Sequence, residues 1–147
     1  MAMADVAIKT SLMIDFEQCE LMPIIPNPGK IICVGHNYEE HRLETGRAPT
    51  SHPAVFLRSA DSQVGHLQPV WIPKVSSQID FEGELAVIIG RDGRYIEASN
   101  AGGHIAGYAC YNDISVRDWQ RHSTQFTCGK ISPEQAHSFP GLLRSTN

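Results

Sequence analysis

Short apolar stretches separated by glycine, proline and polar residues run through most of the chain. Four of them have strand length, 31–35, 54–57, 85–89 and 105–111, and the first and third are rich in β-branched residues. A further stretch at 70–73, bounded by prolines, predicts an edge strand. Asn37 and Gly46 delimit one short predicted helix, and Ser115 begins another that reaches about Phe126. The pattern therefore predicts a mainly β chain of the α+β class.

Composition narrows the class of protein. The chain has 147 residues, 41% apolar and 19% charged, with a net charge of -4, which suits one soluble domain. Without a basic run or a long apolar run, neither nucleic acid nor a membrane is expected as a partner. Four cysteines without a C-x-x-C motif favour reduced thiols in the cytoplasm. Three prolines lie between residues 23 and 28, where they prevent regular structure, so residues 1–29 are predicted to form an N-terminal arm or linker.

Three carboxylates alternate along 80–84, where the third apolar run begins. Side chains two residues apart in a strand lie about 7 Å apart on one face, so Asp80, Glu82 and Glu84 are predicted to share a face. Like charges at that spacing raise each other's pKa or recruit a cation, and oxygen ligands suit a hard divalent ion. A strand whose polar face is simply solvated explains the same spacing, and spacing alone leaves both interpretations open.

Other polar residues carry candidate chemistry, each with a plainer alternative. His41 and Glu44 share a helix face and could activate water, or could be an ordinary surface pair. Asp113 ends an apolar run, where ligands are often presented, and Arg58 could hold a substrate carboxylate. Lys130 could stabilise developing negative charge, or could simply be a cation at a helix C-terminus.

Three motifs in order resemble the fumarylacetoacetate hydrolase family. They are Lys30 to Tyr38 with His41 and Glu44, then Asp80 to Gly90, then Gly107-Tyr108 with Asn112 to Gln120. The resemblance runs from about Pro23 to Lys130. It implies a fumarylacetoacetate hydrolase-like β-roll of mixed sheets and short helices, with residues 30–130 as the first half of the catalytic domain.

The resemblance also implies a metal centre. Glu82, Glu84 and Asp113 match the positions that bind Mg²⁺ or Mn²⁺ in the family, and Ca²⁺ is a further possibility from the ligand chemistry. Asp80 matches a position beside these ligands and is expected to support them.

Further positions match the family's catalytic and substrate-binding residues. His41 and Glu44 match the water-activating pair on a short lid helix, and Lys130 matches a lysine that faces the substrate oxyanion. The strand expected to line the substrate pocket contributes Phe56, Arg58 and Ser59, although the family often has lysine where this chain has Arg58.

The implied activity is metal-dependent hydrolysis of C–C bonds in 1,3-dicarbonyl or 2-oxo acid substrates, of the acylpyruvate or fumarylacetoacetate type, through a metal-stabilised enolate. The presence of both water-activating residues favours hydrolysis. Isomerisation or decarboxylation of a 2-oxo diacid needs the same enolate and stays open. A non-catalytic module that pairs with a full-length relative is a further alternative. Full-length members are expected to be homodimers.

The last segment departs from the family's pattern. Residues 131–147 contain breakers and little periodicity, and are expected to form an irregular tail without a strand. We therefore expect a chain truncated after the first half, with a β-roll that is incomplete at its C-terminus. Such a chain is expected to bind metal weakly and to turn over poorly, because the opposite pocket wall is missing.

Overall fold

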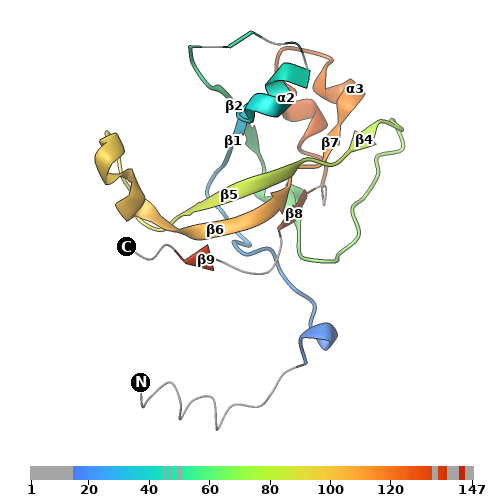
Figure 1. Cartoon of the computed structure of the whole chain (residues 1–147). Helices are drawn as coiled ribbons and strands as arrows, with labels where there is room; N and C mark the ends of the chain where they lie inside the picture. The colour runs from blue at the N-terminus through green and yellow to red at the C-terminus, as the bar shows by residue number, and fades with distance from the viewer. Residues whose placement is uncertain are drawn as a thin grey trace.

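The computed structural model describes residues 15–44, 46, 48–49, 51–133, 136–138 and 143–144. Short 3-10 helices (η), α-helices and strands alternate along this part of the chain (Figure 1). In order they are η1 (Phe16–Gln18), β1 (Ile31–Gly35), α2 (Glu39–Glu44), β2 (Ala54–Arg58), η2 (Ala60–Ser62), β3 (Gln63–Val64), β4 (Ile79–Asp80), β5 (Gly83–Ile89), η3 (Ala98–His104), β6 (Ile105–Asn112), β7 (Ser115–Val116), α3 (Arg117–Gln120), η4 (Phe126–Gly129), β8 (Ala136–Ser138) and β9 (Leu143–Arg144).

The antiparallel pair β5–β6 is the longest feature of the structure. Gly83 lies opposite Asn112, and the pairing continues to Ile89 opposite Ile105. Strand β6 also pairs with β8 and β9, and β8 pairs with β3, so these five strands form one sheet in the order β3-β8-β6-β5 with β9 beside β6. Two smaller antiparallel pairs, β1–β2 and β4–β7, complete the strands of the described part. The prediction of a mainly β chain of the α+β class is confirmed.

Several predicted elements form where the pattern placed them. Strands β1, β2, β5 and β6 coincide with the four apolar runs. Helix α2 lies inside the predicted 37–46 segment, and Gly46 at φ 65° donates its N–H to the Leu43 carbonyl, 3.0 Å away. This is the left-handed stop that glycine adopts without steric cost.

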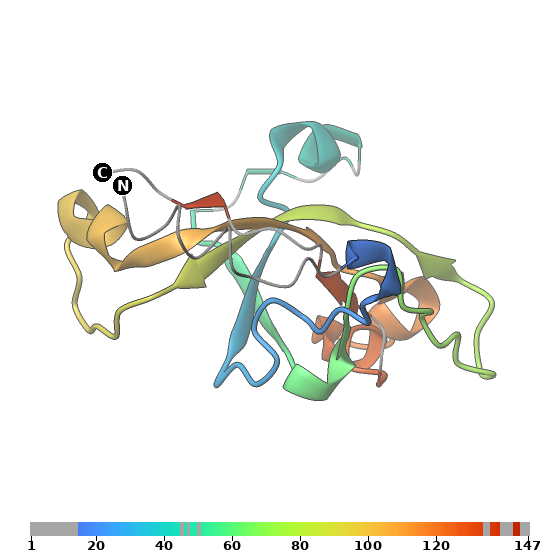
Figure 2. The same cartoon turned by 90° about the horizontal axis from the view of Figure 1, so that it is seen from below.

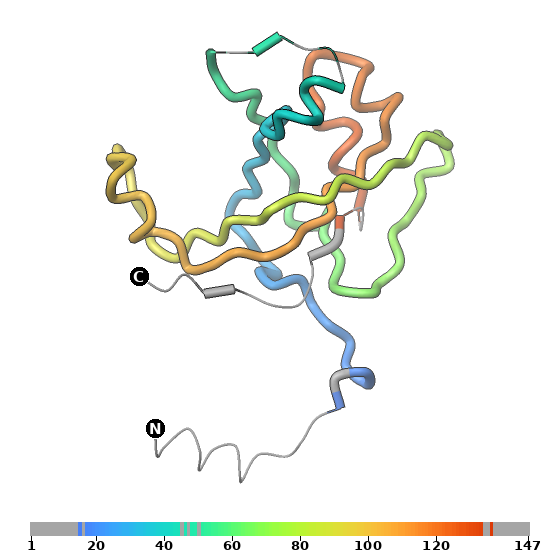
Figure 3. Tube along the Cα trace, viewed as in Figure 1, coloured from blue at the N-terminus to red at the C-terminus, as the bar shows by residue number. Residues whose placement is uncertain are grey.

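Three predictions about local structure were wrong. Residues 70–73 form no strand and lie in the wide loop between β3 and β4 (Figure 3). The helix expected from Ser115 is only α3, because Ser115 and Val116 pair with β4 instead. The tail beyond Lys130 contains β8 and β9, which join the main sheet and so are not irregular.

Burial alternates along β5, although the apolar run had suggested a buried strand. Leu85, Val87 and Ile89 are 59%, 46% and 64% exposed, whereas the residues between them are half-buried. Alternate strand side chains point to opposite faces, and only one face of β5 packs against the described chain. Most of the buried apolar residues of the described part gather where β2, β6 and β7 meet, namely Phe56, Ala109, Tyr111, Ile114 and Val116, and Val64 and Ala136 are buried in the paired strands β3 and β8.

Helix α2 lies on one side of the β5–β6 ribbon, and α3 and η4 lie on the other (Figure 2). The connection from β1 to β2 carries α2, and the connection after β6 carries β7, α3 and η4. Polar residues from both connections therefore reach the end of the ribbon where β5 starts and β6 finishes.

Candidate active site

The start of β5 and the end of β6 bring two of the predicted metal ligands together. Glu82 directly precedes β5 and Asp113 directly follows β6, so antiparallel pairing makes them neighbours. Asp113 donates its backbone N–H to the Glu82 carbonyl at 2.8 Å, and the Glu82 N–H is donated to the Asn112 side-chain oxygen at 3.1 Å. Residues 31 positions apart are thus fixed side by side by the backbone.

Lys130 bridges these two carboxylates. Its ammonium nitrogen Nζ lies 2.7 Å from Glu82 Oε1 and 2.6 Å from Asp113 Oδ2, and the residue is fully buried. The position depends on Gly129, because a Cβ there would lie 2.6 Å from both the Val116 carbonyl oxygen and the Gln120 nitrogen. Lys130 is therefore an internal ion-pair partner and not a solvent-exposed cation at a helix end.

Arg58 holds Asp113 from the opposite side. Its guanidinium donates to Asp113 Oδ1 at 2.5 Å, to the Ile114 carbonyl at 3.1 Å and to the Ser62 hydroxyl at 3.3 Å. The Arg58 side chain is completely buried. Contrary to the expectation of a substrate-binding residue, Arg58 points away from solvent and positions Asp113.

Phe56 and Ser59 are the other two residues that were predicted to line the substrate pocket, and they differ in what they contact. Phe56 lies in the core, and Lys130 Nζ is 5.1 Å from the centre of its ring, a cation–π contact. The Ser59 carbonyl accepts a hydrogen bond from the Ser62 hydroxyl at 2.8 Å. Phe56 faces the cleft described below, whereas Arg58 and Ser59 do not line it.

Two residues that were not predicted to belong to the site hold Glu82 in place. The Ser115 hydroxyl donates a short hydrogen bond to Glu82 Oε1, and Arg117 lies 2.7 Å from the same oxygen. Arg117 also contacts Asp80 at 2.9 Å, so Asp80 acts on Glu82 through Arg117. Asp80 and Glu82 do not lie in one continuous strand with Glu84, because β4 ends at Asp80 and β5 begins only at Gly83. The polar run from Asn112 to Asp118 was the available sequence signal for both residues.

The two glutamates have opposite pKa shifts. Burial raises the pKa of Glu82, but Lys130, Ser115 and Arg117 together outweigh burial, and the net pKa is lowered. Burial raises the pKa of Glu84, a hydrogen bond from Tyr38 lowers it, and the charges of Glu82 and Asp113 raise it, so its net pKa is raised. Glu84 therefore has a weaker set of cationic partners than Glu82.

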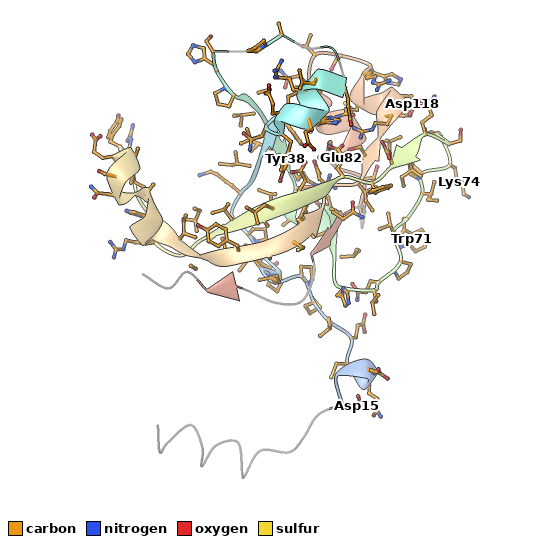
Figure 4. All side chains as sticks on the ribbon, viewed as in Figure 1. Asp15, Tyr38, Trp71, Lys74, Glu82 and Asp118 are labelled. Atoms are coloured by element: carbon orange, nitrogen blue, oxygen red, sulfur yellow. The ribbon has the colours of Figure 1, made fainter. Side chains whose placement is uncertain are left out.

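Tyr38 connects the α2 side of the molecule to β5. Its hydroxyl bonds to Glu84 and also accepts the Leu85 backbone N–H at 3.3 Å. In Figure 4, Tyr38 and Glu82 are labelled next to each other, between α2 and the β5–β6 ribbon in that view. The tyrosine is another functional candidate that the sequence analysis missed, although it lies within the first family motif.

The predicted water-activating pair lies on α2. His41 Nδ1 and Glu44 Oε2 are 3.8 Å apart, and their side chains are 45% and 77% exposed. The His41 ring stacks on His36, with ring centres 6.2 Å apart, and His36 has a left-handed backbone at φ 56°. Such strain in a non-glycine residue is concentrated at functional sites. The structure places His41 at the cleft and leaves Glu44 on its outer side.

One cleft of about 1330 Å³ joins these groups. Its lining includes seven of the ten residues predicted to act at the site or beside it: His41, Phe56, Asp80, Glu82, Glu84, Asp113 and Lys130. Apolar residues of β1 and β5 form much of the remaining wall. A mostly apolar cleft with a few convergent charged groups is the usual form of a small-molecule site.

The carboxylates have the right chemistry to bind a hard divalent cation, but in this arrangement Lys130 forms ion pairs with two of them. Glu82, Glu84 and Asp113 offer only carboxylate oxygens, which Mg²⁺ and Mn²⁺ prefer. Within the described part of the chain, however, no three His, Cys, Asp or Glu side chains converge as a group that could hold a metal ion. Two of the three predicted ligands are instead bridged by the lysine ammonium.

Residues 30–142 match the family described as fumarylacetoacetate (FAA) hydrolase C-terminal. The chain belongs to this family. The match covers all three motifs and extends beyond Lys130 into the segment that holds β8.

Similar curated proteins include two oxaloacetate tautomerases. The mitochondrial oxaloacetate tautomerase of Xenopus laevis is 41% identical over 112 residues, covering 75% of this chain and 35% of that protein. Oxaloacetate tautomerase YisK of Bacillus subtilis is 42% identical over 141 residues, covering 93% of this chain and 47% of that protein. The chain thus spans between about a third and a half of the length of these relatives.

Solved structures of the same fold include 5-carboxymethyl-2-hydroxymuconate delta-isomerase from Mycobacterium smegmatis. It is 30% identical, with a TM-score of 0.79, and the alignment covers 94% of this chain and 55% of that one. A putative HpcE protein from the same organism has a TM-score of 0.80 at 27% identity, and the alignment covers 97% of this chain and 52% of that one. The fold is therefore that of the fumarylacetoacetate hydrolase family, over about half of those chains. No helix in the described residues is long and apolar enough to cross a membrane.

Proposed function

We propose that this chain carries a divalent-metal-dependent site for enolate chemistry on 2-oxo acids, with keto–enol tautomerisation of a 2-oxo diacid as its reaction. The observation that carries the proposal is the convergence of Glu82, Asp113 and Lys130 at the floor of the cleft, with Glu84 beside them. The relatives named as tautomerases and isomerases support this reaction class over the hydrolysis expected from the sequence.

Each residue has a chemical task in this proposal. Glu82, Glu84 and Asp113 would hold Mg²⁺ or Mn²⁺, and the ion, when bound, supplies a positive centre for the two oxygens of a 2-oxo acid. Lys130 supplies a second positive charge from beside these ligands, where it would stabilise negative charge on the enolate oxygen. Arg58 and Arg117 orient Asp113 and Glu82 through their ion pairs.

The experiment follows ketonisation of enol-oxaloacetate spectroscopically, with Mg²⁺, with Mn²⁺ and with a chelator. Metal should accelerate the reaction, and Glu82→Ala should bring the rate to the uncatalysed level. Glu97→Ala is the matched control, because Glu97 is exposed and makes no side-chain cap. Because the test compares the ketonisation rates of the variants with that of the native chain, it does not depend on how fast the native chain is. Equal rates with metal and with chelator would contradict it.

C–C hydrolysis is the second candidate, and the His41–Glu44 pair at 3.8 Å favours it. A histidine beside a carboxylate is suited to activating water. Product analysis separates the candidates, because hydrolysis of an acylpyruvate releases two acids whereas tautomerisation leaves the carbon skeleton intact. Release of pyruvate in a metal-dependent reaction, without faster ketonisation of oxaloacetate, would replace the first candidate by the second.

A further inference from the structure

The contacts of Lys130 have a consequence for metal binding. Both carboxylate oxygens it contacts are 2.6–2.7 Å from Nζ. Divalent cations lie about 2.0–2.6 Å from their carboxylate oxygens. A metal bound to the same oxygens of Glu82 and Asp113 would overlap the ammonium group, so the two cations cannot be present together in this arrangement.

Asp113 cannot offer its other oxygen without breaking a second ion pair. Oδ1 accepts from Arg58, whose side chain is completely buried and also bonds to Ile114 and Ser62. A planar guanidinium held by three partners has little freedom to move. The lysine ammonium is a point charge on a flexible four-carbon stem. Of the two cations on Asp113, Lys130 is therefore the one that can give way.

Electrostatics supports the same exclusion. Lys130 lies in the core, where its charge is poorly screened by solvent. In the metal-free protein this charge holds together the buried Asp113 carboxylate and the half-buried Glu82 carboxylate, which would otherwise repel each other. The same charge opposes the approach of a divalent ion to the Glu82–Asp113 pair.

We propose that Lys130 is an internal counter-ion that occupies the metal position, and that a divalent ion binds only when the ammonium leaves the Glu82–Asp113 pair. This inference rests on the proposed metal-dependent function. It assigns to Lys130 a task before any substrate binds: the lysine keeps the ligand pair assembled and sets the affinity for metal.

The test measures Mn²⁺ binding to the whole chain by electron paramagnetic resonance, which reports the unbound ion. Lys130→Met removes the ammonium, and Lys74→Met, at an exposed lysine, is the control with the same change in net charge. Opposite charges at this range alter cation binding by about 10- to 1,000-fold, judged from pKa shifts of about 1–3 units. Lys130→Met should therefore bind Mn²⁺ at least about tenfold more tightly than the native chain, with Lys74→Met close to native.

The outcomes separate this inference from the proposed function. If the native chain binds Mn²⁺ and Lys130→Met binds it equally or more weakly, the counter-ion inference is overturned and the metal site stands. If neither chain binds Mn²⁺ at millimolar concentration, the proposed metal site fails and the inference fails with it.

A second measurement on the native chain covers the case in which Lys130→Met does not fold. Acetic anhydride labelling followed by mass spectrometry reports the accessibility of each lysine amine. Saturation with Mn²⁺ should increase labelling of Lys130 several-fold and leave the exposed Lys74 unchanged. Unchanged labelling of Lys130 at saturating metal would show that the ammonium stays in place, and would overturn the inference.

Discussion

Replacing Asp113 by alanine tests the central feature of the site, which is a buried network of compensated charges. Asp113 is 4% exposed and forms ion pairs with Arg58 at 2.5 Å and with Lys130 at 2.6 Å. The side chains of these two cations are 0% and 1% exposed. The alanine variant therefore leaves two buried positive charges, of which Arg58 loses its carboxylate partner and Lys130 keeps only Glu82.

The expected loss of stability is large. A hydrogen bond to a charged group contributes about 1.5–3 kcal/mol, so two of them give about 3–6 kcal/mol. Removing one partner of a buried ion pair costs about 3–5 kcal/mol by direct measurement in other proteins. The two routes agree on a loss of about 3–5 kcal/mol, a large share of the roughly 5–15 kcal/mol by which domains are stable.

Urea unfolding followed by tryptophan fluorescence measures this loss. With an m-value near 2 kcal/mol/M, the midpoint should fall by about 2 M. Asp92→Ala is the control, because Asp92 lies exposed in the loop between β5 and η3 and surface substitutions change stability by about 0.5 kcal/mol or less. A midpoint for Asp113→Ala within about 0.5 M of the native value would refute the buried network.

Three further predictions concern single groups. The pKa of Glu82 is lowered in the folded chain, so the ionised carboxylate stabilises the fold above about pH 4.5, and this stabilisation is lost as the pH falls further. In Glu82→Gln, the free energy of unfolding, measured with urea at a series of pH values, should therefore fall less steeply in acid than in the native chain. Burial raises the pKa of Cys33 to about 12, so iodoacetamide should modify Cys33 far more slowly than the exposed Cys128. Peptide mapping measures both rates of modification, and equal rates would contradict the prediction. Gly129→Ala should cost about 1–3 kcal/mol in thermal unfolding through its close contacts, whereas Gly102→Ala, in open space, should cost nothing comparable.

The sequence alone determined the four longest strands, the family and the identity of the charged groups. Apolar runs of strand length bounded by breakers specify strands locally, and for that reason β1, β2, β5 and β6 were predicted correctly. The three motifs identified the family, because their residue types and their order along the chain are specific to it. Short elements were missed: β7 replaces part of a predicted helix because Ser115 pairs with a strand 35 residues earlier, and β8 forms by pairing with β3 and β6.

Only the tertiary structure decided what each charge contacts. Arg58 and Lys130 are both cations in sequence, yet one faces away from the cleft and the other bridges Glu82 and Asp113 at its floor. Spacing along a strand relates Glu82 to Glu84, but it cannot relate Glu82 to Asp113, which antiparallel pairing of β5 and β6 makes its neighbour. Contacts between distant segments depend on register and packing, and local pattern contains neither.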